Sequence, residues 1–309
     1  MVSGGAVQVT VLVVTYNRKE LLRHCLGALL EQTAQVEHLV IVDNASSDGT
    51  AAWLREWVPA NIPKAQLVAM NENMGGAGGF AAGLKHAMDD GADWIWMMDD
   101  DACPHSTALE ELLKIAVNPQ NIYGSLAVAG LHTAWITTLV DEGRTVNVAD
   151  QVPAQARVEY IPFLGLMIHR DLVKKIGLPD EGFFIAADDV EYCVRAKKAG
   201  ANMIIAGKSR IEHPRAQVSQ LNVCDKKIAY LTLPPWKRYY DTRNRILIAR
   251  QYYGIRLFTQ TIPGTLVRLF AALMSDPHKS MQLRAFVAGM VDGLLGIKGR
   301  RHKKWGLDQ

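Results

Sequence analysis

Apolar and polar positions alternate in blocks along the first hundred residues, in a way that predicts strands followed by helices. Apolar, β-branched runs predict four strands at residues 8–14, 38–42, 66–70 and 93–98. Helical spacing of apolar residues predicts helices over 19–32, over about 50–57, and from a glycine-rich loop to about 89. Strands that alternate with helices form a mostly parallel, Rossmann-like sheet with right-handed crossovers. We therefore expect an α/β fold whose functional loops lie at the carboxyl ends of the strands.

The pattern changes after the fourth predicted strand. Residues 121–168 read as short strands and loops, and residues 183–200 include a polar helix. From Trp236 onward the chain has helical spacing with aromatic and basic faces. We therefore predict an α/β domain over residues 1–215 and a mainly helical, basic region over residues 216–309.

Composition narrows the class of protein. The chain has 309 residues, of which 49% are hydrophobic and 21% charged, and this excludes a disordered, collagen-like or coiled-coil protein. We find no secretory leader and no run of about eighteen apolar residues, so we do not expect a membrane-spanning chain. The absence of a CxxC pair argues against a zinc site or a disulfide framework and favours a reducing cytoplasm. The four cysteines are Cys25, Cys103, Cys193 and Cys224.

Charge is distributed unevenly along the chain. Residues 1–235 carry 20 Lys and Arg against 27 Asp and Glu, a net charge of −7. Residues 236–309 carry 14 basic against 4 acidic residues, a net charge of +10. Such a basic segment indicates an anionic partner, either nucleic acid or a lipid surface.

Three consecutive aspartates follow the fourth predicted strand. Alternate residues of an extended segment point the same way, so Asp99 and Asp101 can converge on a cation while Asp100 points elsewhere. Mg²⁺ or Mn²⁺ held by one or two carboxylates commonly bridges substrate phosphates. The alternative is a solvated acidic turn that caps the helix after Pro104.

Two other strand ends carry candidate ligand-binding residues. Asp43 ends the second strand, where it would either accept hydrogen bonds from a ligand or cap a turn. The four glycines within residues 75–79 would let the backbone approach a diphosphate or a sugar closely. This run is neither GxGxxG nor a P-loop, so by itself it does not identify the ligand.

A second acidic cluster follows the aromatic and apolar run of residues 182–187. A carboxylate of Asp188, Asp189 or Glu191 beside an apolar wall is a candidate general base, because desolvation raises its pKa. The same acids would also suit the first turn of a helix. His213, which follows a short apolar patch, is either a structural residue or a ligand, depending on its neighbours.

Six features occur along the chain in a fixed order. They are VTYNR (14–18), VDNASSDGT (42–50), NENMGGAGGF (71–80), MDDD (98–101), ADDVEYCVRAKKAG (187–200) and His213. This order resembles family 2 glycosyltransferases with a GT-A fold, over roughly residues 8–215. The GGAGGF and WMMDDD stretches resemble in particular the bacterial galactofuranosyltransferases and rhamnosyltransferases.

The resemblance implies a role for each feature. Asp99 and Asp101 would hold Mn²⁺ or Mg²⁺ with His213 as the third protein ligand, and Asp189 would be the catalytic base. The residues expected to bind the nucleotide-sugar donor are Thr15, Asn17, Arg18, Asp43, Asn73, Gly75, Gly76 and Asp100. Those expected to contact the acceptor or support the site are Asp188, Glu191, Arg243 and Asn244.

The C-terminal region is similar to the family as well. YYDTRNR (239–245) resembles a segment of transferases that decorate lipid-linked glycans. Residues 255–274 interleave two arginines with apolar residues, and residues 298–304 form a basic cluster. They predict either a helix lying on an anionic leaflet or a core-packed helix with a solvated charged end. No nucleic-acid-binding motif is found, so nucleic acid is set aside as a partner.

These features predict a metal-dependent, inverting glycosyltransferase on the cytoplasmic face of the cell membrane, active in cell-envelope polysaccharide or O-antigen synthesis. The preferred donor is UDP-galactofuranose, with dTDP-rhamnose as the alternative, and the acceptor is a hydroxyl of a lipid-linked glycan. Ala186 and Ala187 stand where we expect the family's tryptophan, so the resemblance does not fix the acceptor. A nucleotidyltransferase would need a basic glycine-rich loop after the first strand, and VTYNR (14–18) is not such a loop. A non-catalytic membrane-associated scaffold is the alternative from another class, and the oligomeric state stays open.

Overall fold

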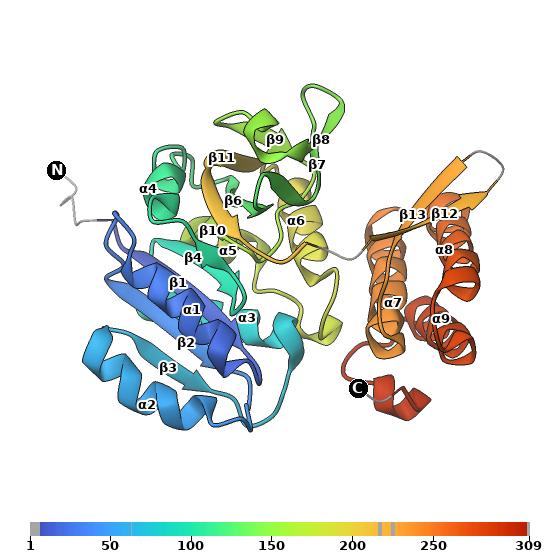
Figure 1. Ribbon diagram of the computed structural model, residues 1–309, viewed down its shortest axis with the longest axis horizontal. Helices are drawn as coiled ribbons and strands as arrows, with labels where there is room; N and C mark the ends of the chain where they lie inside the picture. Colours follow the sequence, from blue (N-terminus) through green and yellow to red (C-terminus); the bar gives the residue numbers. More distant parts are fainter. Residues whose placement is uncertain (1–6, 63, 216–217, 224–225, 308–309) are drawn as a thin grey trace. The chain divides into compact units, whose positions relative to one another are not determined.

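The chain is organised in two units. The computed structural model describes residues 7–62, 64–215, 218–223 and 226–307 (Figure 1). The first unit consists of Met1–Pro179 and Tyr192–Arg215, and the second of Asp180–Glu191 and Ala216–Gln309. The chain divides after Arg215, and residues 180–191 group with the C-terminal part.

A sheet of eleven strands, counted over the described residues, forms the centre of the first unit (Figure 1). Ten of them lie in the order β3 (Gln66–Ala69), β2 (His38–Asp43), β1 (Val9–Thr15), β4 (Trp94–Asp99), β10 (Leu166–His169), β6 (Ile122–Ala129), β11 (Met203–Glu212), β9 (Ala156–Val158), β7 (His132–Leu139) and β8 (Arg144–Val148). The short strand β5 (Cys103–Pro104) pairs with β11. A 3₁₀ turn, η1 (Ala149–Gln151), follows β8.

The parallel arrangement predicted from the alternating pattern is confirmed for β3, β2, β1 and β4. Beyond β4 the sheet is mixed. Strand β10 runs antiparallel to both β4 and β6, whereas β6 and β11 pair in parallel. Strands β7, β8 and β9 pair in antiparallel fashion. Antiparallel neighbours need only short turns, which explains why no strand-helix alternation is visible in the sequence there.

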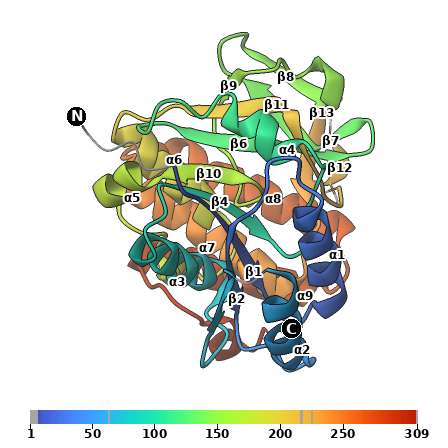
Figure 2. The same ribbon diagram turned by 90° about the vertical axis from the view of Figure 1, so that its left-hand side faces the viewer.

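Helices cover both faces of this sheet. One face carries α1 (Lys19–Leu30), α2 (Thr50–Asn61) and α4 (Ala108–Leu113). The other carries α3 (Gly75–Asp89), α5 (Arg170–Ile176) and the later turns of α6 (Asp188–Lys198). Figure 2 shows α3 and α1 on opposite sides of β1. The alternation of side chains along β1 produces this layering, because Val11 and Val13 join one core cluster and Leu12 and Val14 the other.

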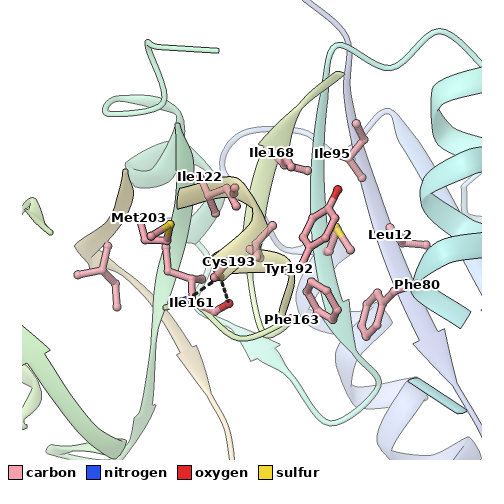
Figure 3. Close-up of a cluster of buried hydrophobic side chains, with 14 of the residues drawn as sticks. Leu12, Phe80, Ile95, Ile122, Ile161, Phe163, Ile168, Tyr192, Cys193 and Met203 are labelled. Carbon is pink, nitrogen blue, oxygen red and sulfur yellow. Dashed lines mark hydrogen bonds between the residues drawn. The ribbon is translucent and has the colours of Figure 1, made fainter. Parts of the chain in front are cut away.

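The core on the α3 face is packed around aromatic rings. The ring centroid of Phe163 lies 4.6 Å from that of Phe80 and 5.9 Å from that of Tyr192 (Figure 3). The thiol of Cys193 accepts from the backbone N–H of Ile161 and donates to its carbonyl oxygen, both at 3.4 Å. Of the other cysteines, Cys25 is a buried free thiol, Cys103 is a half-buried free thiol, and Cys224 lies outside the described residues.

Glycines allow α3 to pack very close to the sheet. A Cβ atom at Gly79 would lie 2.5 Å from Val14 Cγ1, and one at Gly83 would lie 2.2 Å from Leu12 Cδ1. No side chain fits at these distances without displacing its neighbours. Part of the glycine-rich stretch is therefore used for helix-strand packing, and of its four glycines only Gly76 is half-buried rather than buried.

The second unit is mainly helical, with one antiparallel hairpin. Its elements are η2 (Glu181–Phe183), the start of α6, β12 (Val218–Val223), β13 (Lys226–Leu231), α7 (Pro235–Tyr252), the π-helical turn η3 (Leu257–Thr261), α8 (Ile262–Ser275), α9 (Lys279–Leu295) and η4 (His302–Trp305). Helices α7 and α9 approach closely at Gly289 and Gly293, where an added Cβ would meet Tyr239 O at 2.7 Å and Ile246 Cβ at 2.9 Å.

One helix of the described residues is long and apolar enough to cross a membrane, judged by length and composition alone. It is Leu257–Ser275, with 19 residues and a mean hydropathy of 1.3, and 22% of the window is buried. The expectation from the sequence concerned an unbroken apolar run, and this helix does not contain one. Thr, Gln, Pro and Gly interrupt the apolar run in the sequence, but they do not end the helix.

Candidate functional site

The carboxyl ends of β1, β2 and β4 lie side by side. The parallel register pairs Thr15 with Asp43 and Val14 with Asp99. The loops that follow these three strands therefore meet at one edge of the sheet, which is where ligands bind in open α/β sheets.

Asp100 is the buried anchor of this edge. Its Oδ2 accepts a hydrogen bond from Thr15 Oγ1 at 2.8 Å and another from the backbone N–H of Tyr16 at 3.4 Å. Its Oδ1 accepts from Arg18 Nη1 at 3.2 Å. Burial raises the pKa of Asp100 above its ordinary value, although the Thr15 hydroxyl and the Arg18 guanidinium oppose this shift. Asp100 thus ties the loop after β1 to the end of β4.

Asp101 lies between a cation and an imidazole. Its Oδ2 accepts from Arg18 Nη1 at 2.8 Å, and its Oδ1 is 3.6 Å from Nε2 of His213. The rings of His213 and Trp135 pack in a T-shaped arrangement, with centroids 5.7 Å apart. The other ring nitrogen of His213, Nδ1, is buried and has no hydrogen-bond partner within the described part of the chain. The structure therefore brings together Asp101 and His213 of the three expected metal ligands.

Asp99 does not join them to complete a metal cluster. Among the described residues, no group of three His, Cys, Asp or Glu side chains could hold a metal ion. The reason is local, because β4 ends at Asp99 and the chain turns at Asp100 and Asp101. Side chains alternate only along extended backbone, so with a turn at Asp100 strand alternation does not by itself place Asp99 beside Asp101. An oxygen and a nitrogen ligand still fit Mn²⁺ or Mg²⁺ when substrate phosphates supply further ligands.

The loops after β1 and β2 are joined by polar contacts. Asn17 has a left-handed backbone, with φ of 52°, and its N–H donates to Ser46 Oγ at 2.9 Å. The N–H of Ser47 donates to Asn17 Oδ1 at 2.7 Å. Asp43 is buried, and its Oδ1 accepts from the N–H of Ser46 at 3.0 Å. Asp43 therefore caps a turn in this structure, which was the alternative to a direct contact with the ligand.

Asn44 organises the glycine-rich loop and was not among the predicted residues. Its side chain is buried, donates to the carbonyl of Gly75 at 2.8 Å, and accepts from the N–H of Met74 at 2.9 Å. Asn73 Oδ1 accepts from the N–H of Gly75 at 2.8 Å. Gly75 itself needs its positive φ of 71° at this corner. Asn44 directly follows the strand-end residue Asp43, and this position is the signal that could have identified Asn44.

An open hollow lies beside Trp135. Its lining includes Ser125, Thr137, Glu159 and Tyr160. Trp135, which lines this hollow, also contacts His213. No sequence signal identifies Trp135, because this residue lies in the region where the strand pattern is weak.

The second acidic cluster lies in the first turn of α6, within the second unit. Burial raises the pKa of Asp188, and the charge of Asp189 raises it further. Burial also raises the pKa of Asp189, but the N–H of Val190, which donates to Asp189 Oδ1 at 2.7 Å, and the charge of Arg245 act against it. Asp188 is therefore the carboxyl that retains its proton to higher pH, and Asp189 is the one that ionises first.

Helix α7 holds the segment around this cluster. Asn244 and Arg243 are fully buried and donate hydrogen bonds to backbone carbonyls of residues 182–186. Glu191 is buried too, and its Oε1 accepts from the hydroxyl of Tyr252 at 2.5 Å. Of the four residues expected to contact the acceptor or support the site, Arg243, Asn244 and Glu191 are thus buried and bonded to other parts of the same unit.

Comparison with known proteins gives the following matches. Residues 10–176 match the family model described as "Glycosyl transferase family 2". The chain is 32% identical over 208 residues to galactofuranosyltransferase GlfT1 of Mycolicibacterium smegmatis, covering 62% of this chain and 66% of that protein. It is 24% identical over 294 residues to the dTDP-rhamnosyl transferase RfbF of Shigella flexneri, covering 93% of this chain and 95% of that protein.

A solved structure with a similar fold is that of GalNAc-T7 with UDP, GalNAc and Mn²⁺. The TM-score is 0.63 at 12% sequence identity, and the match covers 90% of this chain and 55% of the other. At this identity the likeness concerns the fold alone.

Proposed function

Because this chain belongs to glycosyltransferase family 2 and has a GT-A fold, we propose that it transfers galactofuranose from UDP-galactofuranose to a hydroxyl group of a cell-envelope glycan. The observation that carries this proposal is the Asp101–His213 pair beside Arg18 and Asp100, at the strand ends of a chain similar to a galactofuranosyltransferase. A non-catalytic scaffold is set aside, because the comparisons identify a glycosyltransferase.

The leaving group of this reaction is a nucleoside diphosphate, which must be neutralised. Asp101 and His213 would hold a Mn²⁺ or Mg²⁺ ion, and such an ion supplies positive charge to the diphosphate oxygens. Arg18, which donates to both Asp100 and Asp101, adds a permanent positive charge beside them. Asp99, which the resemblance assigns to the metal, lies at the end of β4 and stays a proposed further ligand.

The donor nucleotide is assigned to the loops after β1, β2 and β3. Asn17, Asp43 and Thr15 shape the first two loops, and the loop of Asn73, Gly75 and Gly76 follows the third. The start of α3, which Asn44 fixes, presents backbone N–H groups of the kind that bind phosphate.

We assign Asp189 as the base that accepts the proton of the acceptor hydroxyl. As that proton passes to the carboxylate, the acceptor oxygen forms a bond to the anomeric carbon, and the bond from that carbon to the diphosphate oxygen breaks. Attack from the face opposite the leaving group inverts the anomeric configuration. The raised pKa of Asp189 brings it closer to neutral pH, where a base is most effective. Asp188 stays protonated to higher pH and serves as its neutral neighbour.

We place the enzyme on the cytoplasmic face of the membrane through its second unit. Helices α8 and α9 pack together, and each carries exposed apolar residues at helical spacing. On α8 these are Leu266, Val267, Phe270 and Met274, and on α9 Leu283, Val287, Val291, Leu294 and Leu295. We call these exposed residues of α8 and α9 the apolar stripe. Because residues 236–309 also carry a net charge of +10, we propose that the apolar stripe binds an anionic lipid surface.

The proposal is tested with a panel of nucleotide sugars. Purified protein is incubated with Mn²⁺, a lipid-linked acceptor and one of UDP-galactofuranose, UDP-galactopyranose, dTDP-rhamnose or GDP-mannose, and nucleotide release is measured. We expect release above background with UDP-galactofuranose. The dTDP-rhamnosyl transferase similarity makes dTDP-rhamnose the alternative donor, and faster release from it would refute the assigned sugar while keeping the enzyme class.

Asp189→Asn is the companion variant. It preserves the size of the side chain and removes its basicity, so we expect turnover to fall by about 10²- to 10⁴-fold while donor binding persists. If Asp188→Asn loses turnover and Asp189→Asn keeps it, the base is the other member of the pair.

A further inference from the structure

The loop that leads into Asp188 and Asp189 has a strained backbone. Three residues that are not glycine, Phe184, Ala186 and Ala187, have φ angles of 65°, 69° and 59°. Side chains disfavour this left-handed region, so such a conformation persists only where the surroundings enforce it. The contacts that enforce it here come from the same unit of the protein.

Asn244 of α7 makes most of these contacts. Its side-chain nitrogen donates to three carbonyl oxygens of the loop, those of Phe183 at 3.0 Å, Ile185 at 2.9 Å and Ala186 at 2.7 Å. Arg243 adds two more through Nη2, to Gly182 at 3.1 Å and Phe183 at 2.8 Å. Both side chains have 0% exposure, so water does not compete for these oxygens.

The two side chains also fix each other. Arg243 Nε donates to Asn244 Oδ1 at 2.9 Å, which orients the amide so that its nitrogen faces the loop. The guanidinium lies 4.8 Å from the ring centroid of Tyr240, and its Nη1 donates to the carbonyl of Gly299 at 2.6 Å. Its hydrogen-bond partners among the described residues are thus neutral oxygens. A planar, five-donor guanidinium can satisfy such a set, and a lysine ammonium cannot.

The hydrogen bonds that Arg243 and Asn244 donate to residues 182–186 form a clamp on the loop. This clamp lies directly before the first turn of α6. The N–H of Glu191 donates to the carbonyl of Ala187 at 3.0 Å, which closes that turn. The carbonyl of Ala186, one residue earlier, is the one that Asn244 holds at 2.7 Å. Since Asp189 lies within this turn, a rotation of the loop would rotate its carboxylate as well.

We propose that Arg243 and Asn244 are positioning residues, which hold residues 182–187 in their strained form and thereby set the orientation of the Asp189 carboxylate. This inference rests on the proposed role of Asp189 as the base. Neither residue is assigned a contact with substrate. Their function is to hold the loop in the one conformation that presents the base. Without them the loop would relax.

The test compares two buried amides of the same unit. Asn244→Ala removes the clamp. Gln282→Ala removes a buried amide of α9 that donates to Leu233 O at 2.9 Å, outside the loop, and serves as the matched control. We expect Asn244→Ala to lower kcat by about 10- to 100-fold with little change in donor KM, because small displacements of a catalytic group have effects of this size. We expect Gln282→Ala to retain kcat, and Arg243→Lys to behave like Asn244→Ala.

Two further measurements separate positioning from general stability. Hydrogen exchange of residues 182–189 should accelerate in Asn244→Ala and stay unchanged in Gln282→Ala. The double variant Asn244→Ala/Asp189→Asn should be no slower than Asp189→Asn alone, since two residues that act through one group are not additive. Multiplied losses in the double variant, or equal losses in the two amide variants, would overturn the inference. Full activity of Asp189→Asn would instead refute the base assignment, and the exchange comparison alone would then decide whether the clamp holds the loop.

Discussion

Replacing Gly83 by alanine tests whether the glycines of α3 serve packing. An alanine in a helix interior is more stable than a glycine by about 0.8–1 kcal/mol. At Gly83, however, the new Cβ would lie 2.2 Å from Leu12 Cδ1 and 2.8 Å from Val42 Cγ2, and both neighbours are fully buried. Overpacking of this kind costs about 1–3 kcal/mol. The free energy of unfolding should therefore change little at best and fall by about 2 kcal/mol at worst.

Gly27 of α1 offers a matched control. A Cβ at this position has nothing within 4 Å, so Gly27→Ala should raise the free energy of unfolding by about 1 kcal/mol. The assay is urea denaturation followed by tryptophan fluorescence, combined with the donor KM of each variant. A displaced α3 also moves its first residue, Gly75, so only Gly83→Ala should raise the donor KM. Equal stabilisation of both variants would refute the packing argument.

Three other outcomes follow from the site and the surface. Asp101→Ala should weaken Mn²⁺ binding in the presence of UDP, measured by calorimetry, more than Asp99→Ala does, because Asp101 lies beside His213, and equal losses would contradict this. Asp188→Asn should stabilise the protein increasingly as the pH rises from about 4 to 8. Burial and the charge of Asp189 raise the pKa of Asp188 in the folded protein. The wild-type protein therefore loses stability as the pH rises, because Asp188 ionises more readily in the unfolded chain, and the Asn variant does not have this loss. A pH-independent difference between the two proteins in denaturant unfolding would contradict this. Phe270→Ser should lower co-sedimentation with anionic vesicles at high salt and leave turnover on a soluble acceptor unchanged, and unaltered sedimentation would remove α8 from the membrane surface.

The parallel half of the sheet could be predicted because each of its elements has its own signal. Strand β2, for example, is predicted at 38–42 and observed at His38–Asp43, and helix α1 is predicted at 19–32 and observed at Lys19–Leu30. Helix α2 continues to Asn61, past the predicted end at 57, although Pro59 lies inside it. A proline near the end of a helix breaks few hydrogen bonds, so composition alone does not locate the end of α2.

The detailed geometry of the aspartate triplet could not be predicted, because it depends on where the strand ends. Alternation would point Asp99 and Asp101 the same way if the extended backbone continued through all three residues. The turn at Asp100 removes this relation and directs Asp100 towards Thr15 and Arg18. A pattern of residues identifies the chemistry of such a cluster, but the backbone decides which carboxylates share a ligand.

The environment of the second acidic cluster depends on contacts that are distant in sequence. Asn244 and Phe183 are 61 residues apart, and no periodicity relates them. The sequence resemblance assigned Asn244 to the acceptor or to the support of the site, and only the structure separates these roles. The positive φ angles of Ala186 and Ala187 were equally hidden, because alanine gives no signal for a left-handed backbone.

The positive charge of the C-terminal region is partly used inside its own unit. Lys298 pairs with Asp180 at 2.5 Å, Arg301 pairs with Asp292 at 2.9 Å, and Arg243 is fully buried. The net charge of residues 236–309 therefore overstates what a lipid surface would meet, and the apolar stripe on α8 and α9 must supply more of the proposed attachment. A chain that ends at Gly296 would lose the Gly299 carbonyl bound by Arg243 as well as the basic cluster. Truncation therefore disturbs the loop before Asp189, and substitutions within the apolar stripe are the cleaner way to separate membrane attachment from catalysis.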